Sequence, residues 1–239
     1  MLDNLQDLNV TDVFYKGKLV DRNAPIRVKT CGRALKHTVH LDKVKAEQFV
    51  LPIGKKKTHV IGINPSQITT EDLAVSLQPA ANYVPTDGYS KVAAVERHHN
   101  TGKIGVAVAK GYGIRNGAVA SSVSHDSHNI IVIGDNDRDM ALAVDEIIRT
   151  QGGYTVVENG EVFETLPLPI MGLMSDAGFE SVNETLGRMI KKAHEMGVPA
   201  DIEPFITLSF LALPVIPTLR ITPRGLCLLT AKGPEILQE

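Results

Sequence analysis

The stretch NIIVIGDNDRDM, residues 129–140, constrains the fold more than any other part of the chain. Its apolar run is short, unbroken and ends at Gly134, a pattern typical of a buried strand and common in parallel sheets. Asn136 then stands three residues before Asp139, where it can cap a helix. Apolar residues follow at helical spacing: Met140, Val144, Ile147 and Ile148. The stretch therefore predicts a strand, a turn and a helix that packs on a sheet and ends at Gly152-Gly153.

Two further segments have clear local signals. Ser181 and Glu184 have the spacing of a capping box, and Gly197 and Pro199 mark the end of a second helix. The apolar stripe of this helix comprises Leu186, Met189, Ile190 and Ala193. In YTVVENGEVFETL, residues 154–166, Asn159-Gly160 separates two alternating runs and predicts a hairpin.

Three other apolar segments read as strands. They are AEQFVLP (residues 46–52), THVIGINP (58–65) and FITLSFLALPVIP (205–217), the last as a buried strand with its turn. Together with the two helices, they indicate an α/β fold of the mixed α+β kind, in which helices pack on mixed β-sheets.

The first 24 residues look different from the rest. VTDVFYKGKLV, residues 10–20, places Lys16-Gly17 between two apolar pieces and predicts a short hairpin. A polar stretch with a proline follows at residues 21–30. We expect a boundary near residue 24, which separates a segment 1–24 from a domain 25–239.

Composition excludes several classes of protein. The 25 Lys and Arg nearly balance the 27 Asp and Glu, and no long basic face appears, so we expect no nucleic-acid partner. No apolar run approaches the roughly 20 residues that span a bilayer, and the N-terminal residues do not resemble a signal peptide, so we expect no membrane partner. Cys31 and Cys227 lack a CxxC spacing, which fits a reducing cytoplasm.

The histidines are the most suggestive chemical groups, but none lies in a recognised metal motif. The chain contains neither HExxH nor the HxE and PCxxC pair of zinc deaminases, so we expect no metal site within it. The sequence also lacks a GxSxG elbow, and the residues alone do not identify a catalytic group.

Two loops concentrate the imidazoles. SHDSHN carries His125, Asp126 and His128 directly before the buried run, and ERHHNTGK carries Glu96, His98 and His99 between two apolar strands. These residues can bind a ligand or move protons. Alternatively, Asp126 and Ser127 fix a turn and nearby carbonyls satisfy the imidazoles.

Four blocks of sequence in this order resemble the C-terminal region of bacterial adenine deaminases. The blocks are VERHHNTGKIG, ASSVSHDSHNIIVIG, LPLPIMGLMSD and TLSFLALPVIPTLRIT. The opening LDNLQDLNVTDVFYKGKLV is similar to the segment with which amidohydrolases return from the catalytic barrel to their small β-sandwich. The resemblance covers nearly the whole chain and implies that residues 25–239 are the C-terminal α/β domain.

The resemblance also implies an activity that this chain does not contain by itself. The family converts adenine and water to hypoxanthine and ammonia in purine salvage, in a (β/α)8 barrel that binds manganese or iron. No position here matches the residues that would bind this metal. We therefore expect an upstream barrel, in the same gene or as a separate chain, and no activity from this chain alone.

Within that family, the loops described above have the potential to cover the barrel mouth. His125, Asp126 and His128 would line or support the substrate pocket, with His98, His99 and Glu96 as further candidates. Apolar residues among the first 24 would drive docking to the barrel or homo-oligomer formation.

Two alternatives stay open at this point. In the first alternative, the chain is a catalytically silent purine-binding or assembly module. In the second, it is an independent metalloenzyme. The second alternative requires the ERHH and HDSH loops to meet in space and bind a metal.

Overall fold

The computed structural model describes residues 1–21, 23–24, 31–54, 57–86 and 88–237. They form two compact units, Met1–Cys31 and Gly32–Glu239. The expected boundary near residue 24 adjoins residues 25–30, which lie outside the described part of the chain.

The first unit contains the predicted hairpin. Strand β1 (Phe14–Tyr15) pairs antiparallel with β2 (Lys18–Leu19) across Lys16 and Gly17, whose φ angles of 50° and 76° are those of a tight hairpin turn. Most of the large apolar side chains of this unit are exposed: Met1, Leu2, Leu5, Leu8, Val10, Val13, Phe14, Tyr15, Leu19 and Val20. A segment this small has no core of its own in which to bury them.

An eight-stranded mixed sheet organises the second unit, with the order β10-β9-β7-β8-β5-β6-β3-β4. Its strands are β3 (Thr58–Ile63), β4 (Thr70–Val75), β5 (Tyr89–Val95), β6 (Ile104–Lys110), β7 (Gly117–Ser121), β8 (Ile130–Gly134), β9 (Gly153–Glu158) and β10 (Glu161–Pro167). Only β3 and β6 run parallel to each other among these neighbours; the other pairs are antiparallel.

The strand β8 is completely buried, as predicted, but its expected parallel pairing is wrong. It lies antiparallel between β5 and β7. Its unbroken apolar run results from layers on both faces of the sheet, because a strand covered on both faces needs no polar positions.

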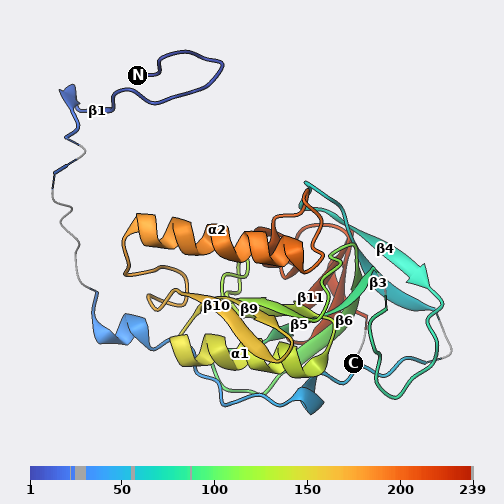
Figure 1. Ribbon diagram of the computed structural model, residues 1–239. Coiled ribbons are helices and arrows are strands. Elements are labelled where there is room, and N and C mark those ends of the chain that lie inside the picture. The colour runs from blue at the N-terminus through green and yellow to red at the C-terminus, as the bar shows by residue number, and fades with distance from the viewer. Residues whose placement is uncertain (22, 25–30, 55–56, 87, 238–239) are drawn as a thin grey trace. The chain divides into compact units, whose positions relative to one another are not determined.

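Helix α1 (Asp137–Thr150) covers one face together with the 3-10 helix η2 (Ala46–Phe49). Helices α2 (Phe179–Glu195) and α3 (Pro204–Leu211) cover the other face. A second sheet of β11 (Leu219–Thr222), β12 (Gly225–Thr230) and β13 (Gly233–Ile236) also packs on that face. Figure 1 shows α1 and α2 on opposite faces of the large sheet. A short 3-10 helix, η1 (Arg33–Lys36), lies near the start of the unit.

The two predicted helices and the hairpin between them are present, with one start misplaced. The side chain of Asn136 accepts a hydrogen bond from the backbone of Asp139, and α1 ends one residue before Gln151, which is left-handed. The capping box at Ser181 is wrong, because α2 begins two residues earlier, at Phe179. Asn159 and Gly160 form the turn between β9 and β10, with φ angles of 52° and 82°.

Two segments predicted as strands are helical. Residues 204–211 form α3, in which Pro204 occupies the first turn and the Glu203 carboxylate accepts from the backbone of Ile206. This helix is apolar on most sides because it lies between the sheet and the loops that follow, so its sequence lacks an amphipathic period. Ala46–Phe49 form η2, which buries Phe49 against α1. The structure is nevertheless of the predicted mixed α/β class, and no helix in the described ranges is long and apolar enough to cross a membrane.

Candidate functional site

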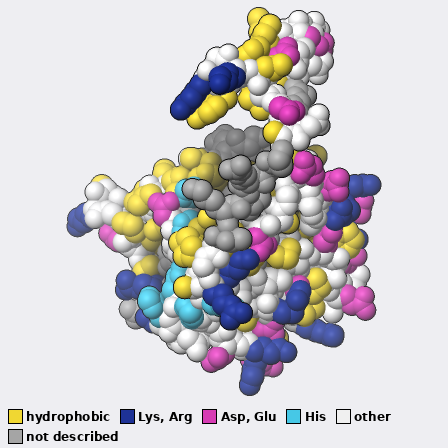
Figure 2. All heavy atoms as spheres, turned by 90° about the vertical axis from the view of Figure 1, so that its left-hand side faces the viewer, with side chains coloured by type: hydrophobic (Ala, Val, Ile, Leu, Met, Phe, Trp, Pro, Cys, Tyr) yellow, Lys and Arg dark blue, Asp and Glu magenta, His cyan; other side chains and the backbone are white. Residues whose placement is uncertain are grey.

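The two imidazole-bearing loops meet at one end of the large sheet. One loop, residues 96–103, joins β5 to β6, and the other, residues 122–129, joins β7 to β8. Val95 pairs with Ile130, so antiparallel pairing brings both loops to the same end. His98 Nε2 lies 2.8 Å from the carbonyl oxygen of Ser127. We call these two loops together the histidine edge. Figure 2 shows histidine side chains gathered on one face of the molecule, beside hydrophobic side chains.

Glu96 is used by its own loop. Its carboxylate accepts hydrogen bonds from the backbone N–H groups of His98, His99 and Thr101, and from the Thr101 hydroxyl. Burial raises the pKa of Glu96, but these hydrogen bonds outweigh burial and hold the pKa below its ordinary value. Glu96 therefore stabilises the loop as a carboxylate and has little capacity left to act as a base.

His125 and Asp126 form an exposed pair at the tip of the other loop. His125 Nδ1 lies 2.5 Å from Asp126 Oδ1. The ring stacks on Phe210 of α3, with centroids 5.2 Å apart, and the backbone N–H of His125 donates to the carbonyl of Ser209. Two residues of one helix thus fix the position of this imidazole.

His128 is more enclosed than His125. Its Nδ1 is buried and has no hydrogen-bond partner among the described residues. Burial and the nearby Arg97 lower the pKa of His128, so the ring is neutral at neutral pH. Its backbone is left-handed, with a φ of 51°. Unlike His125, its ring forms no hydrogen bond with a carboxylate of the residues that the structure describes.

Arg97 joins the histidine edge to two other segments, a role that the sequence did not reveal. Its side chain is 1% exposed and donates only to acceptors in the backbone and one hydroxyl. The acceptors are the carbonyls of His128, Thr38 and Met171 and the Thr38 hydroxyl. Burial lowers the pKa of the guanidinium to about 10, so it is charged at neutral pH.

Arg97 also stabilises unusual backbone conformations. His128 and Met171 both have positive φ angles, 51° and 59°, and both present their carbonyls to the guanidinium. Left-handed backbone is unfavourable for non-glycine residues unless the surroundings hold it. Arg97 thus positions the loops on either side of it, although the ERHH motif gave no indication of this role.

The predicted site residues are therefore together, but they do not form a metal site. His98 and His128 lie next to Arg97 in the same edge, and the His99 ring is 6.3 Å from that of His98. Across the described residues, no group of three or more His, Cys, Asp or Glu side chains is arranged to hold a metal ion. The ERHH and HDSH loops meet, as an independent metalloenzyme requires, but the ligand set of such an enzyme is not among these residues.

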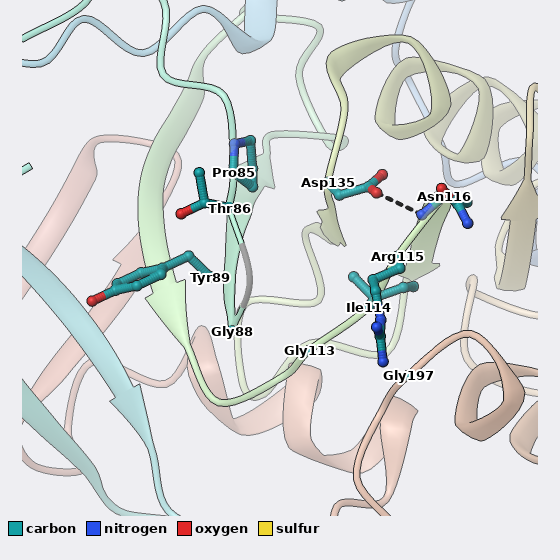
Figure 3. A pocket seen from close by; sticks show the side chains of 10 residues that line it. All are labelled: Pro85, Thr86, Gly88, Tyr89, Gly113, Ile114, Arg115, Asn116, Asp135 and Gly197. Atoms are coloured by element: carbon teal, nitrogen blue, oxygen red, sulfur yellow. Dashed lines mark hydrogen bonds between the residues drawn. The ribbon is translucent and has the colours of Figure 1, made fainter. Parts of the chain in front are cut away.

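A cavity of about 460 Å³ lies at the opposite end of β8 (Figure 3). It lies between Thr86 and Asp135, and three glycines, Gly88, Gly113 and Gly197, contribute to its lining. The Asp135 carboxylate already accepts from the backbone of Asn116 and Gly117 and from the Asn136 amide. It is therefore occupied in fixing the turn, and the histidine edge is the stronger candidate site.

Comparison with known proteins gives a consistent result. Residues 67–232 match the family model of the adenine deaminase C-terminal domain. The matched range contains both loops of the histidine edge.

Several relatives carry the name adenine deaminase. The relative from Desulfitobacterium hafniense (strain Y51) is 49% identical over 228 residues, which is 95% of this chain and 40% of the relative. The relative from Nitratidesulfovibrio vulgaris (strain DP4) is 44% identical over 232 residues, again 95% of this chain and 40% of the relative. The relative from Clostridium acetobutylicum is 39% identical over 234 residues, or 94% of this chain and 41% of the relative. The chain thus spans about 40% of the length of the relatives it matches.

Proposed function

Because the chain belongs to the adenine deaminase C-terminal domain family, we propose that it acts as the C-terminal part of an adenine deaminase. The reaction would convert adenine and water to hypoxanthine and ammonia, in purine salvage in the cytoplasm. The observation that carries the proposal for the site is that both imidazole-bearing loops meet at one edge and are held there by Arg97.

The catalytic groups would lie in the upstream part of the enzyme. The described residues do not offer a metal-ligand set, so they do not fit the manganese or iron of the family. The relatives are more than twice as long as this chain, which leaves ample room for a catalytic barrel upstream. The contribution of this chain would then be to the surroundings of the substrate.

We expect the histidine edge to cover the mouth of that barrel. His125, Asp126 and His128 would line or support the substrate pocket, with His98, His99 and Glu96 behind or beside them. A rigid polar cover excludes bulk water and fixes hydrogen-bonding groups around a bound purine. The hydrogen bonds of Arg97 and Glu96 supply this rigidity.

The exposed apolar residues of the first unit suit the same arrangement. The β1-β2 hairpin has two residues in each strand and exposes Phe14, Tyr15 and Leu19. An isolated hairpin of this size is unstable in water, so it would gain stability by joining a sheet of the upstream part. Apolar surface of this kind also favours a homo-oligomer.

A chimera tests the proposal. The C-terminal 40% of the Desulfitobacterium hafniense relative would be replaced by this chain, and ammonia release from adenine would be measured with manganese or iron supplied. We expect no turnover by the chain alone, and turnover by the chimera that greatly exceeds turnover by the upstream part alone.

Two results would contradict the proposal. Turnover by the isolated chain would mean that it contains its own catalytic site. A folded chimera that binds adenine without releasing ammonia would favour the alternative, a silent purine-binding or assembly module.

A further inference from the structure

His125 has the one ring nitrogen of the histidine edge that is both oriented by an acid and free for a ligand. The Asp126 carboxylate accepts the hydrogen bond, so Nδ1 carries the proton and Nε2 of the neutral ring is an acceptor. Nε2 forms no hydrogen bond with any described residue, and the side chain is 49% exposed. Stacking on Phe210 covers one face of the ring and leaves this edge of it accessible.

The other candidate groups of the edge are less suited to this task. His98 Nε2 is engaged with the Ser127 carbonyl, and Glu96 is engaged with its own loop. The free Nδ1 of His128 is buried. Among the described residues, no carboxylate forms a hydrogen bond with the His99 ring and so fixes which nitrogen carries the proton. His125 is therefore the group that can present a defined acceptor to a ligand.

We propose that His125 Nε2 accepts a hydrogen bond from the N–H of the five-membered ring of the substrate purine. The inference rests on the proposed function. If the catalytic groups belong to the upstream part, the reacting six-membered ring of adenine faces that part. The five-membered ring, on the other side of the planar base, then faces the domain that covers the site.

The contact would make His125 a specificity residue for the free base. A purine with an alkyl group or a sugar on that nitrogen has no N–H to donate. It would leave the Nε2 acceptor buried without a partner, and sites built to pair a polar group reject ligands that lack the matching group. Asp126 is the positioning residue, because it sets the tautomer of the ring.

The test uses the chimera with the substitution His125→Ala, which should fold because the side chain is exposed. We expect kcat/KM for adenine to fall about 10-fold, the scale of one hydrogen bond. The inhibition constant of 9-methyladenine, which lacks the ring N–H, should fall instead, because the variant no longer leaves an acceptor unpaired beside it. Added imidazole should restore part of the activity on adenine.

The matched control is His59→Ala. His59 is also half-exposed and also pairs through Nδ1 with a carboxylate, Asp72, at 2.9 Å. It lies on β3, which β5 and β6 separate from β8 in the sheet. His59→Ala should change neither kcat/KM for adenine nor the inhibition constant of 9-methyladenine.

The inference fails if His125→Ala weakens the use of adenine and the binding of 9-methyladenine equally, or weakens neither. It also fails if imidazole does not restore activity on adenine. In that case the proposed function would survive as long as adenine turnover by the chimera exceeds turnover by the upstream part alone. If the upstream part alone is as active as the chimera, the proposed function itself is wrong.

Discussion

Replacing Arg97 with lysine should destabilise the protein and loosen the histidine edge at the same time. The substitution keeps a positive charge in a position that is 1% exposed. It replaces a planar fork of donors with a single ammonium group, which cannot reach acceptors on both sides of the fork. The carbonyls of Thr38, His128 and Met171 surround the present guanidinium.

The expected loss follows from these contacts. One ammonium can keep the acceptors on one side, so we expect two of the three carbonyls to lose their charge-assisted hydrogen bonds. Such bonds contribute about 1.5 kcal/mol or more each, so the free energy of unfolding should fall by about 3 kcal/mol. Urea unfolding followed by circular dichroism would measure this change.

Arg220 provides the matched control. It is fully buried and also donates only to carbonyls, those of Ile216, Ile68 and Pro217. Arg220→Lys should cost a similar free energy. Only Arg97→Lys should speed amide hydrogen exchange in residues 122–129. Equal exchange in the two variants, or a loss below about 1 kcal/mol for Arg97→Lys, would refute the reasoning.

Three further predictions concern the same domain. Gly172→Ala should lower the free energy of unfolding by about 1–3 kcal/mol, because Gly172 has a φ of 70° and a Cβ there would lie 2.8 Å from Arg97. Its control, Gly187→Ala, lies in open space on α2 and should raise the free energy of unfolding by about 0.5–1 kcal/mol in the same urea assay. Lys91→Met should cost about 3 kcal/mol in thermal or urea unfolding, because the buried Lys91 ammonium binds Asp137, Asn82 and the Phe49 carbonyl, and the Asp137 carboxylate would lose its cationic partner. An unchanged unfolding midpoint would contradict this. Burial lowers the pKa of His128, so the unfolded chain binds a proton at this ring more strongly than the folded chain does. Stability should therefore decrease as pH falls below about 6.5. The urea midpoints at about pH 7.5 and 5.5 should differ less in His128→Gln than in the unmodified chain.

Local signals predicted the parts of the fold whose hydrogen bonds are local. Asn136 caps α1 and Asn159-Gly160 turns the hairpin, because in both cases the residues that decide the conformation are within three positions of each other. Helix α3 was predicted as a strand, because a short apolar run has the same composition in either conformation. The signal that identifies α3 as a helix is the pair Glu203-Pro204. Glu203 supplies an acceptor for the first turn, and Pro204 is suited to a position within that turn.

The candidate site could be predicted only in part. The histidines stood out by their residue types, and the pairing of Val95 with Ile130 brings their loops together. The orientation of β8 could not be read from its apolar run, because two covering layers bury an antiparallel strand as completely as a parallel one. The positioning role of Arg97 was missed because its acceptors are carbonyls 31 to 74 residues away, and carbonyls have no sequence signature.

The carbonyl acceptors of Arg97 also affect how the domain can evolve. Every amino acid carries a main-chain carbonyl, so the residues at positions 128 and 171 can be exchanged without removing the oxygen that holds their loops. The contacts between these two loops and Arg97 therefore depend on one side chain and on oxygens that every residue carries, while the residues displayed there are free to diversify. A scaffold of this kind permits new ligand preferences to arise by substitution at the loop surface, with little change in the backbone that presents it.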